Sequence, residues 1–272
     1  MLSVYAKLSH EEYAALGRIG RAVIREVSPR RDIVHEGGNS DVIHLILDGW
    51  ACRYKCLSDG RRQTLAVFIP GDVCDPNIDV LKNVDHSVGA ITHLRFSEIS
   101  RTHFDRLTAR YPRIAQAMRW NELVQSSIQR EWILNMGRRN AYEHLAHLIV
   151  ELFHRLRAIG LTRADSCEFP LTQNDLADAT GHSSVHVNRV LQNLKADGLI
   201  ELGNRHVRIP DLERLERAAL FNPNYLHLDH EGAHLDAGFW DPSAQESNFI
   251  QMPEIQRKTL RQLAIRADVS PT

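Results

Sequence analysis

The chain has 272 residues, of which 43% are hydrophobic and 25% are charged, and its formal net charge is −1. At roughly 150 residues per domain, this length predicts about two domains of ordinary globular composition, which excludes a disordered or fibrous protein. The near-neutral charge excludes an arm that binds polyanions through bulk charge, so a nucleic-acid site would need local placement of basic and polar groups.

Targeting signals and cysteine usage predict the compartment. The first ten residues lack a charged segment followed by an apolar core, and no apolar run approaches the roughly 18 residues of a membrane span. Four cysteines are too few for a disulfide framework. We therefore expect a cytoplasmic protein without a membrane partner.

Residues from about 30 to 99 predict an antiparallel β-domain. Short apolar runs, such as Val42–Leu47 and Thr64–Ile69, alternate with Gly, Asp and Pro turn signals, as in sandwiches and barrels. A two-residue period after Asp48-Gly49 predicts a strand with one set of residues on its inner face. This set is Trp50, Cys52, Tyr54 and Cys56.

The cysteines of this region are interpreted as structural. Cys52 and Cys56 would lie about 13 Å apart on one strand, too far to pair or to chelate one ion, which favours two buried small hydrophobes. Cys74 falls in a predicted turn between Asp72 and Asp75, whose charges disfavour a reactive thiolate.

After Arg101 the apolar period becomes helical. One stripe recurs at steps of three and four: Ile114, Ala117, Asn121, Val124 and Ile128. A series at steps of four widens it: Trp120, Val124, Ile128, Trp132 and Met136. So broad a face needs burial against the β-domain, a second copy, or both. We predict a dimerisation helix over 109–137 that breaks near Gly137; the alternative is an intramolecular core helix.

A second helix is predicted between Asn140, which forms a capping-box pattern with Glu143, and Gly160. Four residues on it fall within about 80° of one face: His144, His147, Glu151 and His154. They suit either a Zn²⁺ site or a solvated polar face, and we favour the solvated face. The same holds for three later histidines: His227, His230 and His234.

The segment from Leu171 to Ile200 predicts a helix-turn-helix. Thr172 with Asp175 caps a first helix, Gly181 permits a sharp turn, and Ser183 caps a second helix. At 100° per residue, one face of the second helix packs inward: Val187, Val190, Leu191 and Leu194.

The opposite face of this helix carries groups that suit base edges. Arg189 suits guanine, Asn188 and Gln192 suit adenine, and Val185 suits a thymine methyl. Two short strands joined near Gly203-Asn204 follow as a wing. The residues expected to contact DNA are Thr172, Gln173, Ser183, Ser184, Val185, His186, Asn188, Arg189, Gln192 and Arg205.

These features resemble the Crp/Fnr family of bacterial transcription regulators over about residues 10 to 210. Four residues match its helix-turn-helix pattern: Ala177, Gly181, Val187 and Val190. Glycines and the Pro70-Gly71-Asp72 turn resemble its β-roll. The resemblance implies an α+β fold: an antiparallel, cupin-like β-roll related to cyclic-nucleotide-binding domains, a long dimerisation helix and a winged helix-turn-helix. The domains implied are 1–108, 109–137, 138–211 and, outside the family pattern, 212–272.

The resemblance also implies a homodimer that presents two recognition helices to successive major grooves of double-stranded DNA, about 34 Å apart. RNA polymerase is a further candidate partner. Family members that read guanine strongly carry an Arg-Glu pair where this chain has Ser184 and Val185, so we expect a different operator, with Arg189 as the main base contact.

The departures from the family also bear on a ligand. No Glu follows a glycine near Gly71, and His86 stands where the phosphate-binding Arg would be. Negative charge gathers there instead, on Asp75, Asp79 and Asp85. We therefore expect no cyclic-nucleotide binding. No cysteine precedes Cys52, which argues against an iron–sulfur centre, and no cofactor or metal is expected.

The extension after Asp211 begins as a short helix and then departs from the family near Asn222-Pro223, with a further amphipathic segment over 253–268. Six Lys/Arg against ten Asp/Glu argue against a DNA-binding arm. We predict a sequence-specific transcription regulator that is not an enzyme. The alternatives are a ligand- or metal-sensing module whose helix-turn-helix binds protein, and a metalloenzyme built on the histidines.

Overall fold

The computed structural model describes residues 8–21, 23–38, 42–74 and 83–228, which all lie in one compact unit. The predictions for Asp75, Asp79, His230, His234 and the 253–268 segment fall outside these residues. No helix in the described part has the length and apolar character needed to cross a membrane.

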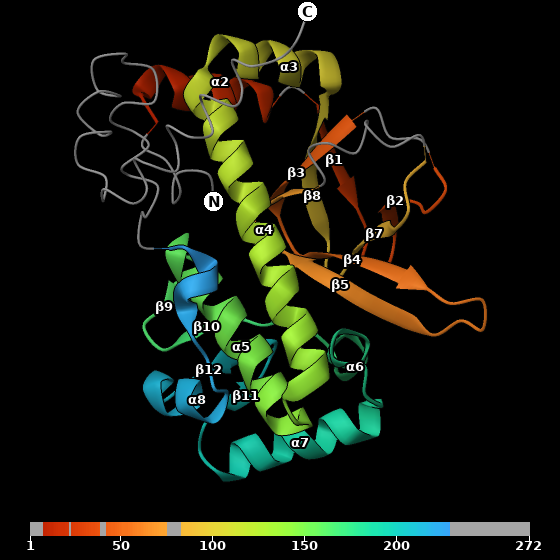
Figure 1. Ribbon diagram of the computed structural model, residues 1–272, viewed down its shortest axis with the longest axis vertical. Coiled ribbons are helices and arrows are strands. Elements are labelled where there is room, and N and C mark those ends of the chain that lie inside the picture. The colour runs from red at the N-terminus through yellow and green to blue at the C-terminus, as the bar shows by residue number, and fades with distance from the viewer. Residues whose placement is uncertain (1–7, 22, 39–41, 75–82, 229–272) are drawn as a thin grey trace, which may run out of the picture. The chain divides into compact units, whose positions relative to one another are not determined.

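The N-terminal half is a pair of four-stranded antiparallel sheets (Figure 1). The first sheet has the order β1 (Ile24–Val27), β8 (Leu94–Ser100), β3 (Val42–Asp48), β6 (Val73–Cys74). The second has the order β2 (Asp32–Val34), β7 (Ser87–Ala90), β4 (Ala51–Cys56), β5 (Arg62–Phe68). Apolar residues of both sheets share one core: Ile46 and Phe96 come from the first sheet, and Ala51, Phe68 and Val88 from the second. The predicted β-roll and the α+β class are confirmed.

Two cysteine predictions, those for Cys56 and Cys74, are corrected by the structure. Cys52 is buried, as expected, and burial raises its thiol pKa to about 11. Cys56 is exposed, because β4 pairs with β7 only as far as Tyr54 and then continues with β5 alone as a protruding hairpin. Cys74 lies in strand β6 rather than in a turn, and it is buried.

Two short helices cover the outer face of the first sheet. These are α2 (His10–Ile19) and α3 (Arg101–Arg110). Ala15 of α2 and Leu107 of α3 share a core with Ile43 and Ile99 of the sheet. This core is separate from the one between the sheets.

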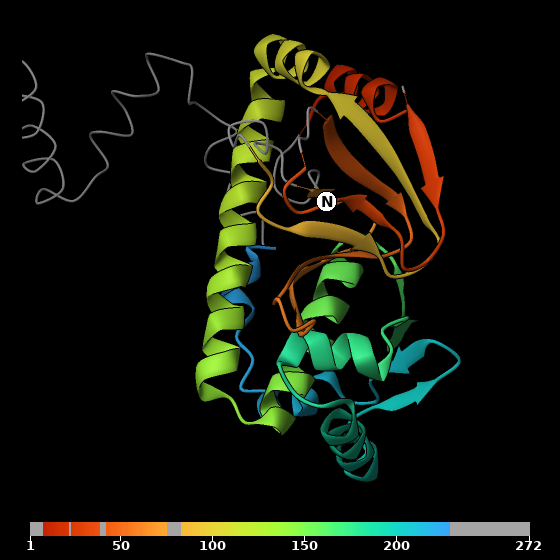
Figure 2. The same cartoon turned by 90° about the vertical axis from the view of Figure 1, so that its right-hand side faces the viewer.

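The long helix α4 (Pro112–Arg138) runs along the β-roll and on to the C-terminal half (Figure 2). It begins at Pro112 rather than 109, and it continues through Gly137, so the break falls at Arg139. The five residues predicted for dimerisation are all buried within this one chain: Ile114, Ala117, Asn121, Val124 and Ile128. The burial favours the alternative of an intramolecular core helix, since Ile114 packs in one of the chain's own cores and Val124 and Ile128 pack in another.

The C-terminal half contains α5 (Ala141–Ala158), α6 (Gln173–Thr180), α7 (Ser184–Ala196) and a four-stranded sheet. The sheet order is β11 (Glu201–Gly203), β12 (His206–Arg208), β10 (Ser166–Glu168), β9 (Thr162–Arg163). The strand pair β11–β12 is the predicted wing, whereas β9 and β10 carry no periodic signal in so few residues. A helix α8 (Leu212–Ala218) and a 3₁₀ turn η2 (Pro223–Leu226) follow and pack on α5 and α4.

Candidate nucleic-acid interface

Helix α7 presents a polar face and buries an apolar one. Val187, Val190, Leu191 and Leu194 are buried, as predicted. On the other side Val185 is 79% exposed, and three polar residues are exposed with it: Asn188, Arg189 and Gln192. An exposed branched apolar side chain beside a guanidinium and two amides matches the groups that base edges offer in a major groove.

Local capping holds α6 and α7 in place. The Thr172 hydroxyl accepts from the Asp175 backbone N–H, and the Asp175 carboxylate accepts from the Thr172 backbone N–H, a complete capping box. Gly181 ends α6 with φ +70°, where a larger residue would be strained. The Ser183 hydroxyl accepts from the His186 backbone N–H at 3.2 Å. The free amides at the start of α7 therefore face outward, where a phosphate can bind.

Side chains on the exposed face are already linked to one another. The Gln173 amide donates to Asn188 Oδ1 at 3.1 Å, which joins α6 to α7. The Arg189 guanidinium donates to His186 Nδ1 at 2.7 Å. These contacts orient Asn188 and Arg189 without burying them.

The wing ends in a tight turn of two left-handed residues, Asn204 and Arg205. This turn places Arg205 at the tip of the wing, where its side chain is exposed. Arg208 on β12 is instead paired with Asp165 and Glu201, at 2.7 Å and 3.0 Å. Of these two arginines, only Arg205 has a guanidinium without a carboxylate partner among the described residues.

A contact that the sequence did not predict joins the β-roll to α6. Arg30, between β1 and β2, forms a two-pronged ion pair with Asp175 and lies 3.5 Å from the Thr172 hydroxyl. Burial alone would raise the pKa of Asp175, but the hydrogen bonds from Arg30 and Thr172 outweigh it and hold the pKa below its ordinary value. The β-roll thus supports the first helix of the helix-turn-helix.

The β4–β5 hairpin adds to this contact. Arg62 lies 3.7 Å from the Asp178 carboxylate, and the Gln63 amide donates to the Ala179 carbonyl at 3.3 Å. No local pattern marks Arg30, Arg62 or Gln63, because their partners on α6 lie more than 100 residues away.

His182 is a further residue at this surface that the sequence did not single out. It lies in the exposed turn between α6 and α7, with its ring 5.1 Å from that of His186. Partial burial, together with the charge of His186, lowers its pKa. Its position in the predicted turn between the two helices was the one feature of the sequence that could have identified it as a surface residue next to α7.

The region expected to lack a cyclic-nucleotide site is described only in part. His86 is buried, and its Nδ1 lies 2.8 Å from the Asp85 carboxylate. That contact lowers the pKa of Asp85. A phosphate placed beside His86 would therefore meet a neighbouring carboxylate.

The polar stripe of α5 is buried, which corrects the solvated face predicted for it. Its four members are His144, His147, Glu151 and His154, and the most exposed of them is His154 at 6%. In the part of the chain that the structure describes, no group of three or more His, Cys, Asp or Glu residues is arranged to hold a metal ion.

Residues after the wing cover this stripe. The Glu151 carboxylate accepts from the Tyr225 hydroxyl at 2.9 Å and from the Trp132 indole. His154 Nε2 lies 2.6 Å from Glu216, and its ring stacks on Phe221. The segment 212–228, the first part of the extension of unknown role expected over 212–272, thus packs on the C-terminal half.

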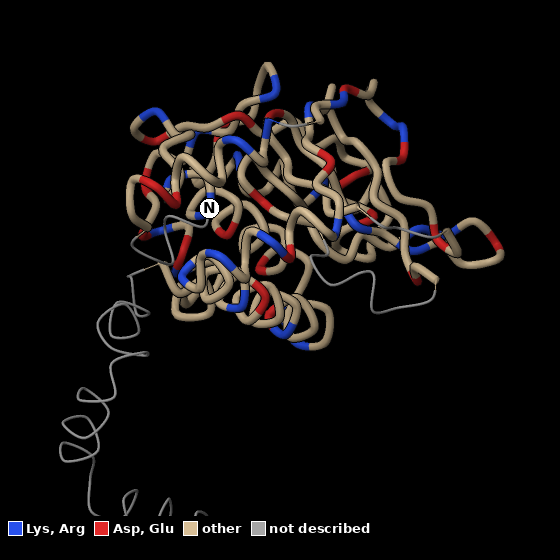
Figure 3. Tube along the Cα trace, turned by 90° about the horizontal axis from the view of Figure 1, so that it is seen from above, with Lys and Arg blue, Asp and Glu red and all other residues tan. Residues whose placement is uncertain are grey.

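Charge is distributed evenly along the trace, with basic and acidic residues interspersed (Figure 3). Helix α7 contains no Asp or Glu, and its Arg and Lys residues are Arg189 and Lys195. Positive charge at this surface therefore comes from a few individual residues, as expected for a chain with a formal net charge of −1.

Two family models match the chain. Residues 143–218 match the model described as a Crp-like helix-turn-helix domain, and residues 24–111 match the model described as a cyclic nucleotide-binding domain. The two matches cover the winged half and the β-roll, respectively.

Curated relatives and solved structures agree with these models. The chain is 30% identical over 218 residues to the transcriptional activator protein FnrL of Cereibacter sphaeroides, covering 78% of this chain and 86% of the relative. It is 29% identical over 213 residues to the transcriptional activatory protein AadR of Rhodopseudomonas palustris, covering 77% and 84%. The FixK2 structure from Bradyrhizobium japonicum superposes with a TM-score of 0.64 at 22% identity, covering 72% of this chain and 96% of that one.

Proposed function

The chain belongs to the Crp/Fnr family of DNA-binding transcription regulators, and from that premise we propose that it acts as a cytoplasmic homodimer on a pseudo-palindromic operator. Each copy inserts α7 into a major groove, with the two half-sites about one helical turn apart. The observation that carries the proposal is the exposed polar face of α7, capped at Ser183 and free of acidic residues.

We expect different residues to contact the bases and the phosphates of the DNA. Arg189 and Asn188 contact base edges, with Gln192 and Val185 beside them on the same face. Ser183, Ser184, His186 and the wing residue Arg205 contact the backbone, as do Thr172 and Gln173 at the start of α6.

The dimer seam lies on the exposed side of α4. Exposed residues recur there at alternating steps of four and three, the spacing of a coiled-coil seam: Arg119, Leu123, Ser126, Arg130, Ile133 and Gly137. Leu123 and Ile133 are 63% and 71% exposed in the single chain. Two copies of α4 that pack along this stripe bury both apolar side chains.

Selection of DNA sites from a random pool by the full chain, followed by footprinting, tests the proposal. It predicts a two-fold symmetric site with half-sites 10–10.5 base pairs apart, centre to centre, and an affinity that falls steeply as salt is added. Recovery of no common site would contradict sequence-specific binding. It would favour the alternative in which the helix-turn-helix contacts protein.

A titration with cyclic AMP and cyclic GMP tests the expected loss of the family's nucleotide site. Because His86 and Asp85 stand where a phosphate needs a guanidinium, we expect no heat of binding at micromolar nucleotide. Saturable micromolar binding of either nucleotide would overturn this part of the proposal.

A further inference from the structure

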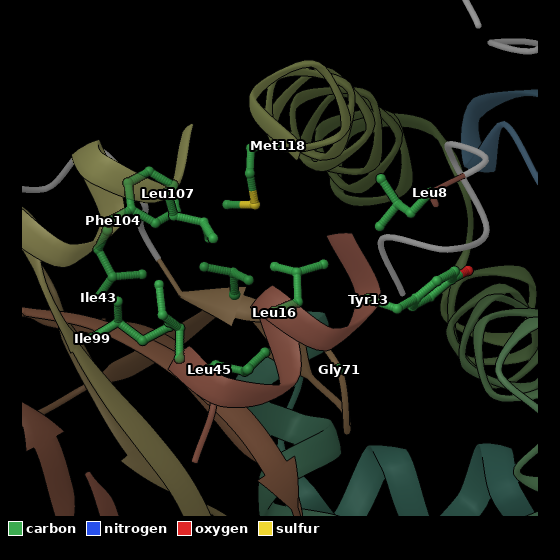
Figure 4. A pocket seen from close by; sticks show the side chains of 12 residues that line it. Leu8, Tyr13, Leu16, Ile43, Leu45, Gly71, Ile99, Phe104, Leu107 and Met118 are labelled. Carbon is green, nitrogen blue, oxygen red and sulfur yellow. The ribbon is translucent and has the colours of Figure 1, made fainter. Parts of the chain in front are cut away.

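A cavity of about 210 Å³ lies on the outer face of the first sheet, under α2 and α3 and beside the first turns of α4. Figure 4 shows side chains from these elements pointing into one space, among them Leu16, Ile43, Phe104 and Met118. Among the residues that line it, the Tyr13 hydroxyl is the one side-chain oxygen or nitrogen. The described side chains that line the cavity are therefore almost all apolar.

The cavity is distinct from the interior of the β-roll. Its walls belong to the core shared by α2, α3, α4 and the outer sheet face, with Ile43, Ile99 and Leu107 as members. The core between the sheets contains other residues, such as Ile46 and Phe96.

A second hollow adjoins the first and is basic. It is lined by Tyr13, Ala14, Gly17, Arg18 and Arg21, so Tyr13 belongs to both. Both arginines are exposed, and neither is paired with a carboxylate of any described residue. Among the described residues that line this hollow, none is acidic.

We propose that these joined hollows form a binding site for an anionic amphiphile, namely a medium-chain carboxylate. An apolar cavity of about 150 Å³ binds benzene, so a cavity of about 210 Å³ suits a chain of roughly eight carbons. The chain enters between Leu16, Ile43 and Met118, and the carboxylate stays at the mouth near Arg18 and Arg21. Arginine suits this headgroup because its planar donors match a carboxylate.

Calorimetric titration of the full chain with octanoate tests the site, with octylammonium as the probe of reversed charge. The proposal predicts saturable binding of octanoate with one site per chain, and binding of octylammonium at least tenfold weaker. The double substitution Arg18→Glu/Arg21→Glu, on the exposed surface, weakens octanoate at least tenfold. Arg106→Glu, an exposed change on α3 outside both hollows, leaves octanoate affinity unchanged.

Leu16→Trp tests the cavity itself, because the indole fills the space. We expect this variant to lose octanoate binding while it keeps the circular-dichroism spectrum and melting temperature of the parent. The arginine variants keep the test decisive if the tryptophan variant does not fold. Absence of octanoate binding to the full chain overturns the proposal, including the case in which another segment of the chain already occupies the cavity. Equal binding of octanoate and octylammonium also overturns it. None of these readouts depends on DNA binding.

Discussion

Arg189 stands at the centre of the exposed face of α7, with its guanidinium hydrogen-bonded to His186 one turn earlier. Because that bond lies on the surface and uses one imidazole nitrogen, the guanidinium can exchange it for two acceptors on a guanine at little cost. The side chain is thus oriented before DNA arrives. Val185 lies one turn earlier on the same face, where we expect it to limit which base fits beside Arg189.

Arg189→Ala should therefore weaken binding to the selected operator by about 1–3 kcal/mol and relax preference at one base pair of each half-site. Fluorescence anisotropy with the operator and with single-base variants measures both effects. Arg106→Ala removes the same charge from α3 and should leave the preference unchanged. A uniform loss across all DNA sequences in the Arg189 variant would assign the residue to the phosphate backbone instead.

At the scale of the element, α5 buries a polar stripe that many helices expose. Burial, reinforced by the charges of His182, His147 and Arg139, lowers the pKa of His144 to about 4. His144 is therefore neutral in the folded protein at physiological pH.

This depressed pKa predicts acid lability. The unfolded chain takes up the proton at His144 near pH 6.5, whereas the folded chain does so near pH 4, so stability is lost as pH falls between these values. The loss amounts to as much as about 3 kcal/mol at the low end. Urea unfolding from pH 7.5 to 4 should show a shallower pH dependence for His144→Gln than for the parent. His93→Gln, at an exposed site, should leave the slope unchanged.

Helix α4 carries two stripes of residues on different faces, and they differ in burial. The more apolar stripe packs inside the chain, from Ile114 to Ile128. The stripe with Leu123 and Ile133 stays exposed because arginines and Ser126 interrupt it. Such a mixed stripe suits a seam that forms between two folded copies.

Leu123→Glu/Ile133→Glu should therefore convert the dimer to a monomer at micromolar concentration, because four carboxylates would meet at the seam. Sedimentation equilibrium measures the change. Gln129→Glu, exposed beside the seam but not part of it, adds a single carboxylate per copy and should remain dimeric. A double variant that still sediments as a dimer would place the interface elsewhere.

At the scale of the whole molecule, the β-roll and the helix-turn-helix are joined by buried and half-buried ion pairs. Arg155 of α5 donates to the Asp72 carboxylate at 2.7 Å, with both side chains buried. Arg30 holds Asp175 at the start of α6. The first pair joins the β-roll to α5, and the second joins it to α6.

Arg30→Ala should lower the free energy of unfolding by about 1–2 kcal/mol, because it leaves the buried Asp175 carboxylate with fewer donors. The value is discounted because the Arg30 side chain is half exposed. Arg25→Ala breaks an exposed pair with Glu98 and should cost less than about 0.5 kcal/mol. Equal losses in the two urea titrations would mean that Arg30 does not support α6.

Local sequence patterns predicted the helices and strands better than they predicted which distant residues pack against them. The caps at Thr172 and Ser183 and the inward valines of α7 depend on neighbours within four residues, so the motif was recognisable from the sequence. The burial of His147 and Glu151 depends on Tyr225 and Phe221, more than 70 residues later, and no periodicity encodes that contact. The same holds for Arg30 and its distant partner Asp175.

The proposed DNA recognition requires that α7 enter the major groove. Guanine N7 atoms lie in that groove, and dimethyl sulfate protection on the selected operator reports them directly. We predict protected guanines in both half-sites, about one helical turn apart, with one guanine per half-site exposed again in Arg189→Ala. Full reactivity of every guanine N7 in the bound complex would contradict the account.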